Sequence, residues 1–186
     1  ICWSLVGSEM CIRDSIGSRD TPVRYNRLLF GLVTHWSYFH TIRSGRCKKG
    51  PDDVVNVVLE QALIENRKPS ILIYPPREVH RGAYDYDYCH YGNPDLEEVR
   101  REIIRGLYPY PDALKEDHYP LHCRNISIIS GVNMDDNVDM VVYAHKSKVV
   151  KGGTAMGVNY AKGLDIPTFN IIHDPLDVII TKTLPG

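Results

Sequence analysis

The feature that most constrains the fold is an alternation of short apolar runs with longer amphipathic stretches, which begins at Ile16. Short runs rich in β-branched and aromatic residues are typical of strands, and apolar residues spaced three or four apart are typical of helices. Strands that alternate with helices build a parallel sheet with helices packed on it. We therefore expect an α/β fold with a mainly parallel sheet.

The pattern assigns an element to most of the chain. Pro51 suits the first position of a helix, and Asp52 and Asp53 suit the positive end of its dipole. After His173 the pattern predicts no element. The expected strands cover residues 38–43, 70–74, 138–144 and 167–172, and the expected helices cover residues 24–36, 95–107, 121–130 and 155–162 and a stretch that begins at Pro51.

The composition indicates one globular domain. The chain has 186 residues, of which 43% are hydrophobic, enough for a core. No run approaches the roughly 20 apolar residues that cross a membrane. The net charge of −1 gives no overall field that attracts nucleic acid. The five cysteines contain no C-x-x-C pair, which favours a reducing, cytoplasmic location. We expect no membrane partner, and a nucleic-acid partner is disfavoured.

The first 15 residues, ICWSLVGSEMCIRDS, resemble the translated sequencing-adapter read-through found at the ends of some metagenomic reading frames. They do not look like a signal peptide, because Glu9, Arg13 and Asp14 interrupt any apolar core. We expect residues 1–15 to be a non-native, adapter-derived segment, and we base no functional argument on them.

Three turns that contain glycine follow expected strands, at residues 17–22, 44–50 and 146–154. In an open parallel sheet such turns lie together at the carboxyl edge, where ligands bind. Glycine lets the backbone approach a phosphate closely, and the N-terminus of the following helix attracts anions. Each turn alone has a plain structural explanation, since tight turns need glycine in any α/β protein.

Five segments in this order resemble the SLOG superfamily, which joins the Smf/DprA and LOG (Lonely Guy) branches. They are GSRDTP (17–22), SGRCKKGPDD (44–53), CRN (123–125), VDMVVYAH (138–145) and KGGTAMGVNYA (151–161). The resemblance implies a Rossmann-like three-layer domain that binds nucleotides or related ligands. It spans most of residues 16–172, and its departure at about 75–121 is expected to be an insertion within a single domain of residues 16–186.

The resemblance also implies a set of ligand-binding residues. Arg124 would meet a phosphate, a task suited to the fork of its guanidinium, although a surface ion pair is an equal alternative. The GGT turn would cradle the phosphate, and Lys146, Lys148 and Lys151 beside it either meet phosphates or form a solvated loop. The implied ligand-binding residues are Gly17, Ser18, Arg19, Ser44, Gly45, Gly50, Arg124, Gly152, Gly153 and Thr154.

One departure from the family bears on catalysis. The phosphoribohydrolase branch reads PGG-x-GT-x-x-E, and its glutamate position holds Gly157 here, which can act as neither acid nor base. We therefore lean toward binding without cleavage. If the chain is an enzyme, the candidate carboxylates are Asp53, Asp85 and Asp87. Asp53 also has a plain structural explanation, because a carboxylate stabilises the start of a helix.

Residues 82–95 have the most unusual composition, with tyrosines interleaved with aspartates. Tyr84, Tyr86 and Tyr88 are candidates for stacking on a base. The same alternation is typical of a half-buried strand or an oligomer contact. His118 and His122 have the spacing of metal ligands on a helix, but Pro120 between them disfavours a regular helix there, and we expect no metal and no cofactor.

The leading hypothesis is a sensor or sequestering protein for a nucleotide or nucleotide-derived ligand of the ADP-ribose type. The alternative is a nucleotide N-glycosidase of the phosphoribohydrolase kind. A weaker alternative is DprA-like binding of single-stranded DNA, which requires a continuous basic groove. The resemblance alone implies a homo-oligomer and a bacterial or phage setting.

Overall fold

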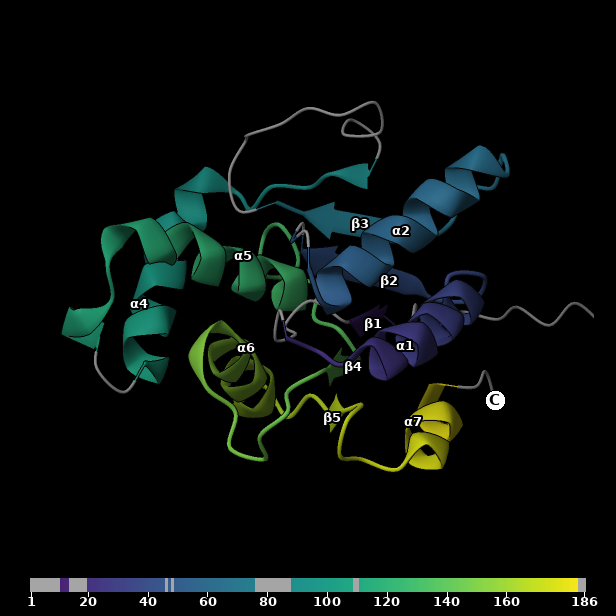
Figure 1. Ribbon diagram of the computed structural model, residues 1–186. Helices are drawn as coiled ribbons and strands as arrows, with labels where there is room; N and C mark the ends of the chain where they lie inside the picture. The colour runs from purple at the N-terminus through teal and green to yellow at the C-terminus, as the bar shows by residue number, and fades with distance from the viewer. Residues whose placement is uncertain are drawn as a thin grey trace, which may run out of the picture.

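One parallel sheet organises the protein. The computed structural model describes residues 11–13, 20–45, 47, 49–75, 88–108 and 111–183. Its five strands are all parallel and lie in the order β3-β2-β1-β4-β5 (Figure 1). The strands are β1 (Cys11–Arg13), β2 (Thr41–Gly45), β3 (Ile71–Tyr74), β4 (Met140–Tyr143) and β5 (Thr168–Asn170). The expected mixed α/β class with parallel strands is confirmed.

Helices connect the strands and follow the last one. The α-helices are α1 (Val23–Trp36), α2 (Pro51–Ile64), α4 (Glu97–Leu107), α5 (Tyr119–Ser130), α6 (Gly152–Gly163) and α7 (Leu176–Thr183). Three short 3-10 helices are η1 (Pro94–Leu96), η2 (Pro111–Ala113) and η3 (Glu116–His118). Within the described residues, no helix combines the length and apolar character needed to cross a membrane.

Two apolar clusters occupy the two faces of the sheet. Helices α1, α2 and α7 contribute to the first cluster, and helices α4, α5 and α6 contribute to the second. Successive side chains of a strand point to opposite faces. Accordingly, Met140 and Val142 of β4 belong to the first cluster, while Val141 between them belongs to the second. The sheet is therefore covered by helices on both faces (Figure 1).

The start of α2 follows the sequence prediction. Gly50 precedes the helix with a φ of 75°, a conformation that favours glycine. Pro51 is the first helical residue, and Asp52 and Asp53 lie in the first turn. These residues place the N-terminus of α2 next to the carboxyl end of β2.

Four differences from the predicted elements exceed one or two residues at an end or bear on the site. The chain after α1 makes a turn in which His40 donates from its backbone N–H to the carbonyl of Trp36, so β2 begins at Thr41 rather than at residue 38. Helix α6 begins at Gly152, so the glycines belong to its first turn. The end of the described chain forms α7, where the pattern predicts no element. The fourth difference concerns the start of α5.

Pro120 does not prevent a regular helix, and this expectation was wrong. Helix α5 begins at Tyr119, which places Pro120 in the first turn. The N–H groups of the first turn have no partner inside a helix, so proline loses nothing there. His118 is the N-cap residue, whose side chain is exposed, while His122 is buried.

The central strand comes from the segment that resembles adapter sequence. Strand β1 pairs with β2 over three residues, from Cys11 opposite Thr41 to Arg13 opposite Arg43. On its other side Ile12 pairs with Met140, and Arg13 pairs with Val141. In this structure, β1 joins the β2-β3 half of the sheet to the β4-β5 half.

A truncation tests the role of β1. A chain that begins at Ile16 lacks the strand that pairs with both β2 and β4, and we expect it to lose the single cooperative unfolding transition in urea. A chain that begins at Glu9 keeps Cys11–Arg13 and serves as the control. Equal unfolding transitions for the two truncated chains would show that β1 adds nothing to stability.

Candidate functional site

The centre of the candidate site is the buried guanidinium of Arg124 on α5. Its Nη1 lies 3.5 Å from Oδ2 of Asp52 in the first turn of α2, and the two side chains are only 11% and 5% exposed. Its Nε and Nη2 donate to Oδ1 of Asn125, at 3.3 and 3.0 Å. Asn125 in turn donates from Nδ2 to the carbonyl of Gly153, at 3.3 Å. Arg124 and Asn125 thus link the starts of α2 and α6.

This arrangement fixes a positive charge at the carboxyl edge of the sheet. The ion pair with Asp52 and the two hydrogen bonds to Asn125 hold the guanidinium of Arg124, so its orientation is set before any ligand arrives. Asp52 offsets the charge of the guanidinium in a place from which water is largely excluded. A preorganised guanidinium suits recognition of phosphate or carboxylate.

Gly45 permits the close approach of this ion pair to the end of β2. A Cβ atom at Gly45 would lie 2.5 Å from Nη1 of Arg124 and 2.5 Å from Oδ2 of Asp52. Both distances are far shorter than any van der Waals contact. Only glycine at this position lets the guanidinium and the carboxylate pack against the strand.

Gly45→Ala tests this contact. We expect it to lower the free energy of unfolding by about 1–3 kcal/mol, because the added methyl group displaces the ion pair. The measurement is urea unfolding followed by circular dichroism. Gly31→Ala on α1 is the matched control, since nothing lies within 4 Å of its Cβ position, and it should be neutral or stabilising by about 0.5–1 kcal/mol. Equal effects of the two changes would contradict the crowding described here.

The first turn of α6 carries the glycine pair. Gly152 has a φ of 66°, and nothing lies within 4 Å of its Cβ position. The backbone conformation, rather than crowding, is therefore what selects glycine there. Thr154 is buried and Gly152 is exposed. Lys151 makes no side-chain cap, so this helix N-terminus presents its backbone N–H groups at the same edge as Arg124.

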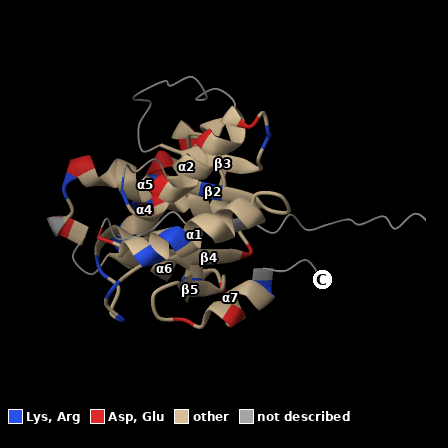
Figure 2. Ribbon diagram, turned by 45° about the vertical axis from the view of Figure 1, so that its right-hand side comes forward, with Lys and Arg blue, Asp and Glu red and all other residues tan. Residues whose placement is uncertain are grey.

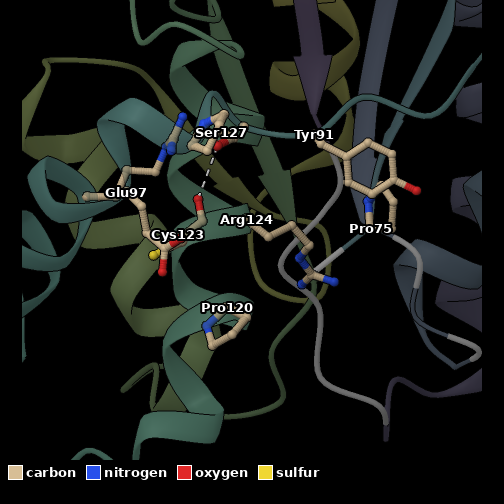
Figure 3. Close-up of a pocket in the computed structure, with 10 residues that line it drawn as sticks. Pro75, Tyr91, Glu97, Pro120, Cys123, Arg124 and Ser127 are labelled. Carbon is tan, nitrogen blue, oxygen red and sulfur yellow. Dashed lines mark hydrogen bonds between the residues drawn. The ribbon is translucent and has the colours of Figure 1, made fainter. Parts of the chain in front are cut away.

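A pocket of about 360 Å³ adjoins Arg124 (Figure 3). It lies between the end of β3, the segment before α4, and the first half of α5. Figure 3 shows the guanidinium of Arg124 toward Tyr91 and Pro75, with Glu97 and Cys123 across from them. The lining residues are Pro75, Tyr91, Gly92, Pro94, Glu97, Arg100, Pro120, Cys123, Arg124 and Ser127.

Cys123 contributes an uncharged side chain to the wall of this pocket. Burial, reinforced by the charge of Glu97, raises the pKa of the Cys123 thiol to about 11. A thiol with such a pKa is protonated at neutral pH and is therefore a poor nucleophile. Ser127, which also lines the pocket, donates from Oγ to the carbonyl of Cys123 at 3.3 Å.

His122 on α5 is buried near the first turn of α6. Its ring meets Tyr108 edge-on at 5.7 Å, and its Cε1 lies 3.8 Å from the Cβ position of Gly153. Its Nδ1 is buried without a hydrogen-bond partner among the described residues. Burial, followed by the charges of His118 and Arg124, lowers the pKa of His122 below 6.5. The folded protein therefore favours the neutral ring.

The stability of the fold should depend on this histidine at acid pH. Because the pKa of His122 is lower in the folded chain than the value of about 6.5 expected when unfolded, the unfolded chain binds the proton more readily. Stability contributed by neutral His122 is thus full above pH 6.5 and is lost as the pH falls below it. Between the pKa values of the folded and unfolded chain, the free energy of unfolding falls by up to about 1.4 kcal/mol per pH unit.

His122→Gln should flatten that dependence between pH 7.5 and 5.5, as measured by urea unfolding. His35→Gln, on the exposed face of α1, is the control. A variant at His122 with the same pH dependence as the unaltered chain would contradict this assignment.

Comparisons with known proteins give no relative for this chain. No family model matches it, and neither a curated protein nor a solved structure matches it. The SLOG resemblance therefore stays a hypothesis that rests on the sequence motifs.

The structure brings together part of the predicted site. Gly45 at the end of β2 lies against the guanidinium of Arg124 on α5, and Asn125 connects Arg124 to Gly153 on α6. Ser44 precedes Gly45 in β2. Gly50 immediately precedes the helix that carries Asp52, and Gly152 and Thr154 flank Gly153. The remaining predictions at Gly17, Ser18, Arg19, Tyr84, Asp85, Tyr86 and Asp87 lie outside the described residues.

Two predicted residues lie elsewhere. Asp53 lines a second pocket, of about 270 Å³, between α1 and α2, together with residues such as Phe30 and Val57. Tyr88 is partly buried and packs against the first apolar cluster. Neither side chain is among those that contact Arg124 or line the pocket beside it.

The sequence analysis missed several residues of the site. Asp52 rather than Asp53 pairs with Arg124, because adjacent helical residues point about 100° apart. Val55, Val58 and Leu59 mark the buried face of α2, whereas Val57, which the sequence pattern assigned to that face, is 44% exposed. A helical projection from the buried face is the signal that separates the two aspartates. Tyr91 lies in the tyrosine-rich stretch of residues 82–95, but no sequence signal marks Glu97, the first residue of α4, as part of the pocket.

Charges are not concentrated on one element. Figure 2 shows residues of both signs distributed over several helices. In the described part of the chain, no three His, Cys, Asp or Glu side chains gather in a way that could hold a metal ion. The features that remain for ligand recognition are Arg124, the first turn of α6 and the adjoining pocket.

Proposed function

We propose that this protein binds a nucleotide or nucleotide-derived ligand, of the ADP-ribose type, as a sensor or sequestering protein of the SLOG superfamily. We also propose that its helices and sheet form a Rossmann-like three-layer domain. The strand order β3-β2-β1-β4-β5 supports this, because the chain connections reverse direction between β1 and β4. Ligands of open parallel sheets bind outside the carboxyl ends of the strands at such a point.

The observation that carries the proposal is the placement of Arg124. Gly45 and Asp52 meet at its guanidinium, and Asn125 connects it to Gly153, so segments far apart in the sequence come together there. A surface ion pair needs neither the burial of both partners nor a glycine that makes room for them. A fixed guanidinium beside the N-terminus of α6 is instead suited to a phosphate group.

Binding without cleavage is the form of the proposal that fits α6. Gly157, at the position of the family's glutamate, is buried within that helix. It offers no group that takes or gives a proton. A ligand held at this edge would therefore meet no acid or base from α6.

A second candidate function is hydrolysis of an N-glycosidic bond, and Asp52 is the observation that favours it. Its carboxylate is nearly buried and is held beside Arg124 at the proposed site. A positioned carboxylate is the group that such a reaction requires. DprA-like binding of single-stranded DNA receives no comparable support, because it needs a continuous basic groove.

Recovery of a bound ligand tests the proposal. Purified protein is incubated with nucleotides, cyclic nucleotides and ADP-ribose derivatives, desalted and denatured, and the released molecules are identified by mass spectrometry. We expect one ligand to be recovered intact. Free base with a sugar phosphate would favour the glycosidase, and Asp52→Asn should then abolish turnover while binding persists. Failure to retain or bind any member of the panel would contradict both functions.

Arg124 variants then locate the site. Arg124→Ala should weaken binding of the recovered ligand roughly 10- to 100-fold, the effect of losing a charged hydrogen bond. Arg124→Lys should restore little, because lysine lacks the planar fork. Arg105→Ala is the control, since Arg105 pairs with Glu98 on the exposed side of α4. Calorimetric titration measures all three, and an unchanged affinity for Arg124→Ala would place the ligand elsewhere.

A further inference from the structure

The pocket beside Arg124 belongs to the part of the chain that departs from the family motifs. Most of its wall comes from residues 75–121, which include the segment before α4 and the start of α5. The motif residues that line the pocket are Cys123 and Arg124, and the guanidinium of Arg124 extends toward Tyr91 (Figure 3). A ligand with its phosphate on Arg124 therefore has this pocket directly beside it.

The walls suit a flat, uncharged ring. Pro75, Pro94 and Pro120 supply rigid apolar surfaces, and Tyr91 supplies an aromatic ring. The Cys123 thiol is neutral because burial raises its pKa. The volume of about 360 Å³ is near the lower end of the range for small-molecule sites, roughly 300–1,000 Å³.

Arg100 holds one wall in place. Its side chain is 2% exposed and donates to the carbonyl of Asn93 at 2.8 Å and to that of Val132 at 2.7 Å. Gly92 packs against it so closely that a Cβ there would lie 2.8 Å from Nη2 of Arg100 and 2.5 Å from Oγ of Ser127. The wall is thus formed before binding, which reduces the entropy that a ligand must overcome.

Glu97 supplies the one carboxylate among the described residues that line the pocket. Nε of Arg101 donates to Oε1 of Glu97 at 3.2 Å, and Nη2 of Arg101 lies 3.2 Å from the same oxygen. Figure 3 shows Glu97 across the pocket from the guanidinium of Arg124. A carboxylate accepts two parallel N–H donors well, and guanine presents such a pair, N1–H and the N2 amino group, on one edge.

We propose that this pocket receives a guanine base, whose N1–H and N2 amino group donate to Glu97 while the phosphate of the same ligand meets Arg124. The inference rests on the proposed function and makes it specific, because it names a guanine nucleotide as the class of ligand. The ring lies over the wall formed by Cys123 and Pro120, and Glu97 selects the base.

Titration with four probes tests this assignment. They are GMP, IMP, which lacks the N2 amino group, AMP, which lacks the N1–H donor, and ribose 5-phosphate, which lacks the base. We expect the unaltered protein to bind GMP about tenfold or more tightly than each of the other three. Equal binding of GMP and IMP, or tighter binding of AMP, would overturn the assignment.

Two variants separate the base from the phosphate. Glu97→Gln should remove the preference for GMP over IMP and leave the binding of ribose 5-phosphate unaffected. Glu98→Gln is the control, because Glu98 pairs with Arg105 outside the pocket, and it should change neither the preference nor the binding of ribose 5-phosphate. Cys123→Leu narrows the pocket and should reduce GMP binding to the level of ribose 5-phosphate, with thermal unfolding as the check on its fold. An unchanged preference in Glu97→Gln overturns the role of Glu97, whatever happens to the Cys123 variant.

The same titrations distinguish this inference from the proposed function. Ribose 5-phosphate that binds through Arg124, with no gain from any base, overturns the guanine pocket and leaves the phosphate site standing. Absence of binding by all four probes overturns the guanine pocket, and the wider ligand panel then decides on the proposed function.

Discussion

The ion pair between Arg124 and Asp52 is the constraint on which the carboxyl edge of this sheet depends. It joins the first turn of α2 to α5, and Asn125 extends the connection to α6. Breaking a buried pair leaves one charge in a place with little water, which costs more than the pair contributes when intact. The positions of three helices at this edge are therefore coupled through one guanidinium.

The class of fold could be predicted from the sequence because it depends on periodicity. The run from Met140 to Tyr143 is continuously apolar, as a strand buried on both faces must be, and the structure places it inside the sheet. Helix α2 was predictable from Pro51 and the valines that follow it. Helix α7 was not, because its apolar residues begin after a turn around Asp174 and give only a short pattern.

The residues of the site could be predicted only where the residue type and its place in a motif indicate a role. Gly45 and Arg124 stood out through their place in short motifs, and the structure brings them into contact. Predicting Asp52 rather than Asp53 requires knowing which face of α2 is buried. Arg100 and Gly92 depend on a contact between α4 and the irregular segment before it, and no local sequence pattern predicts such a contact.

The junction between β1 and β4 has a thermodynamic consequence. Among the described residues, two register pairs join these strands at the centre of the sheet. The link from Asp52 through Arg124 and Asn125 to Gly153 spans this same junction at its carboxyl end. A ligand seated there would stabilise this junction, and its binding would be measured as slower local opening of the strands on both sides.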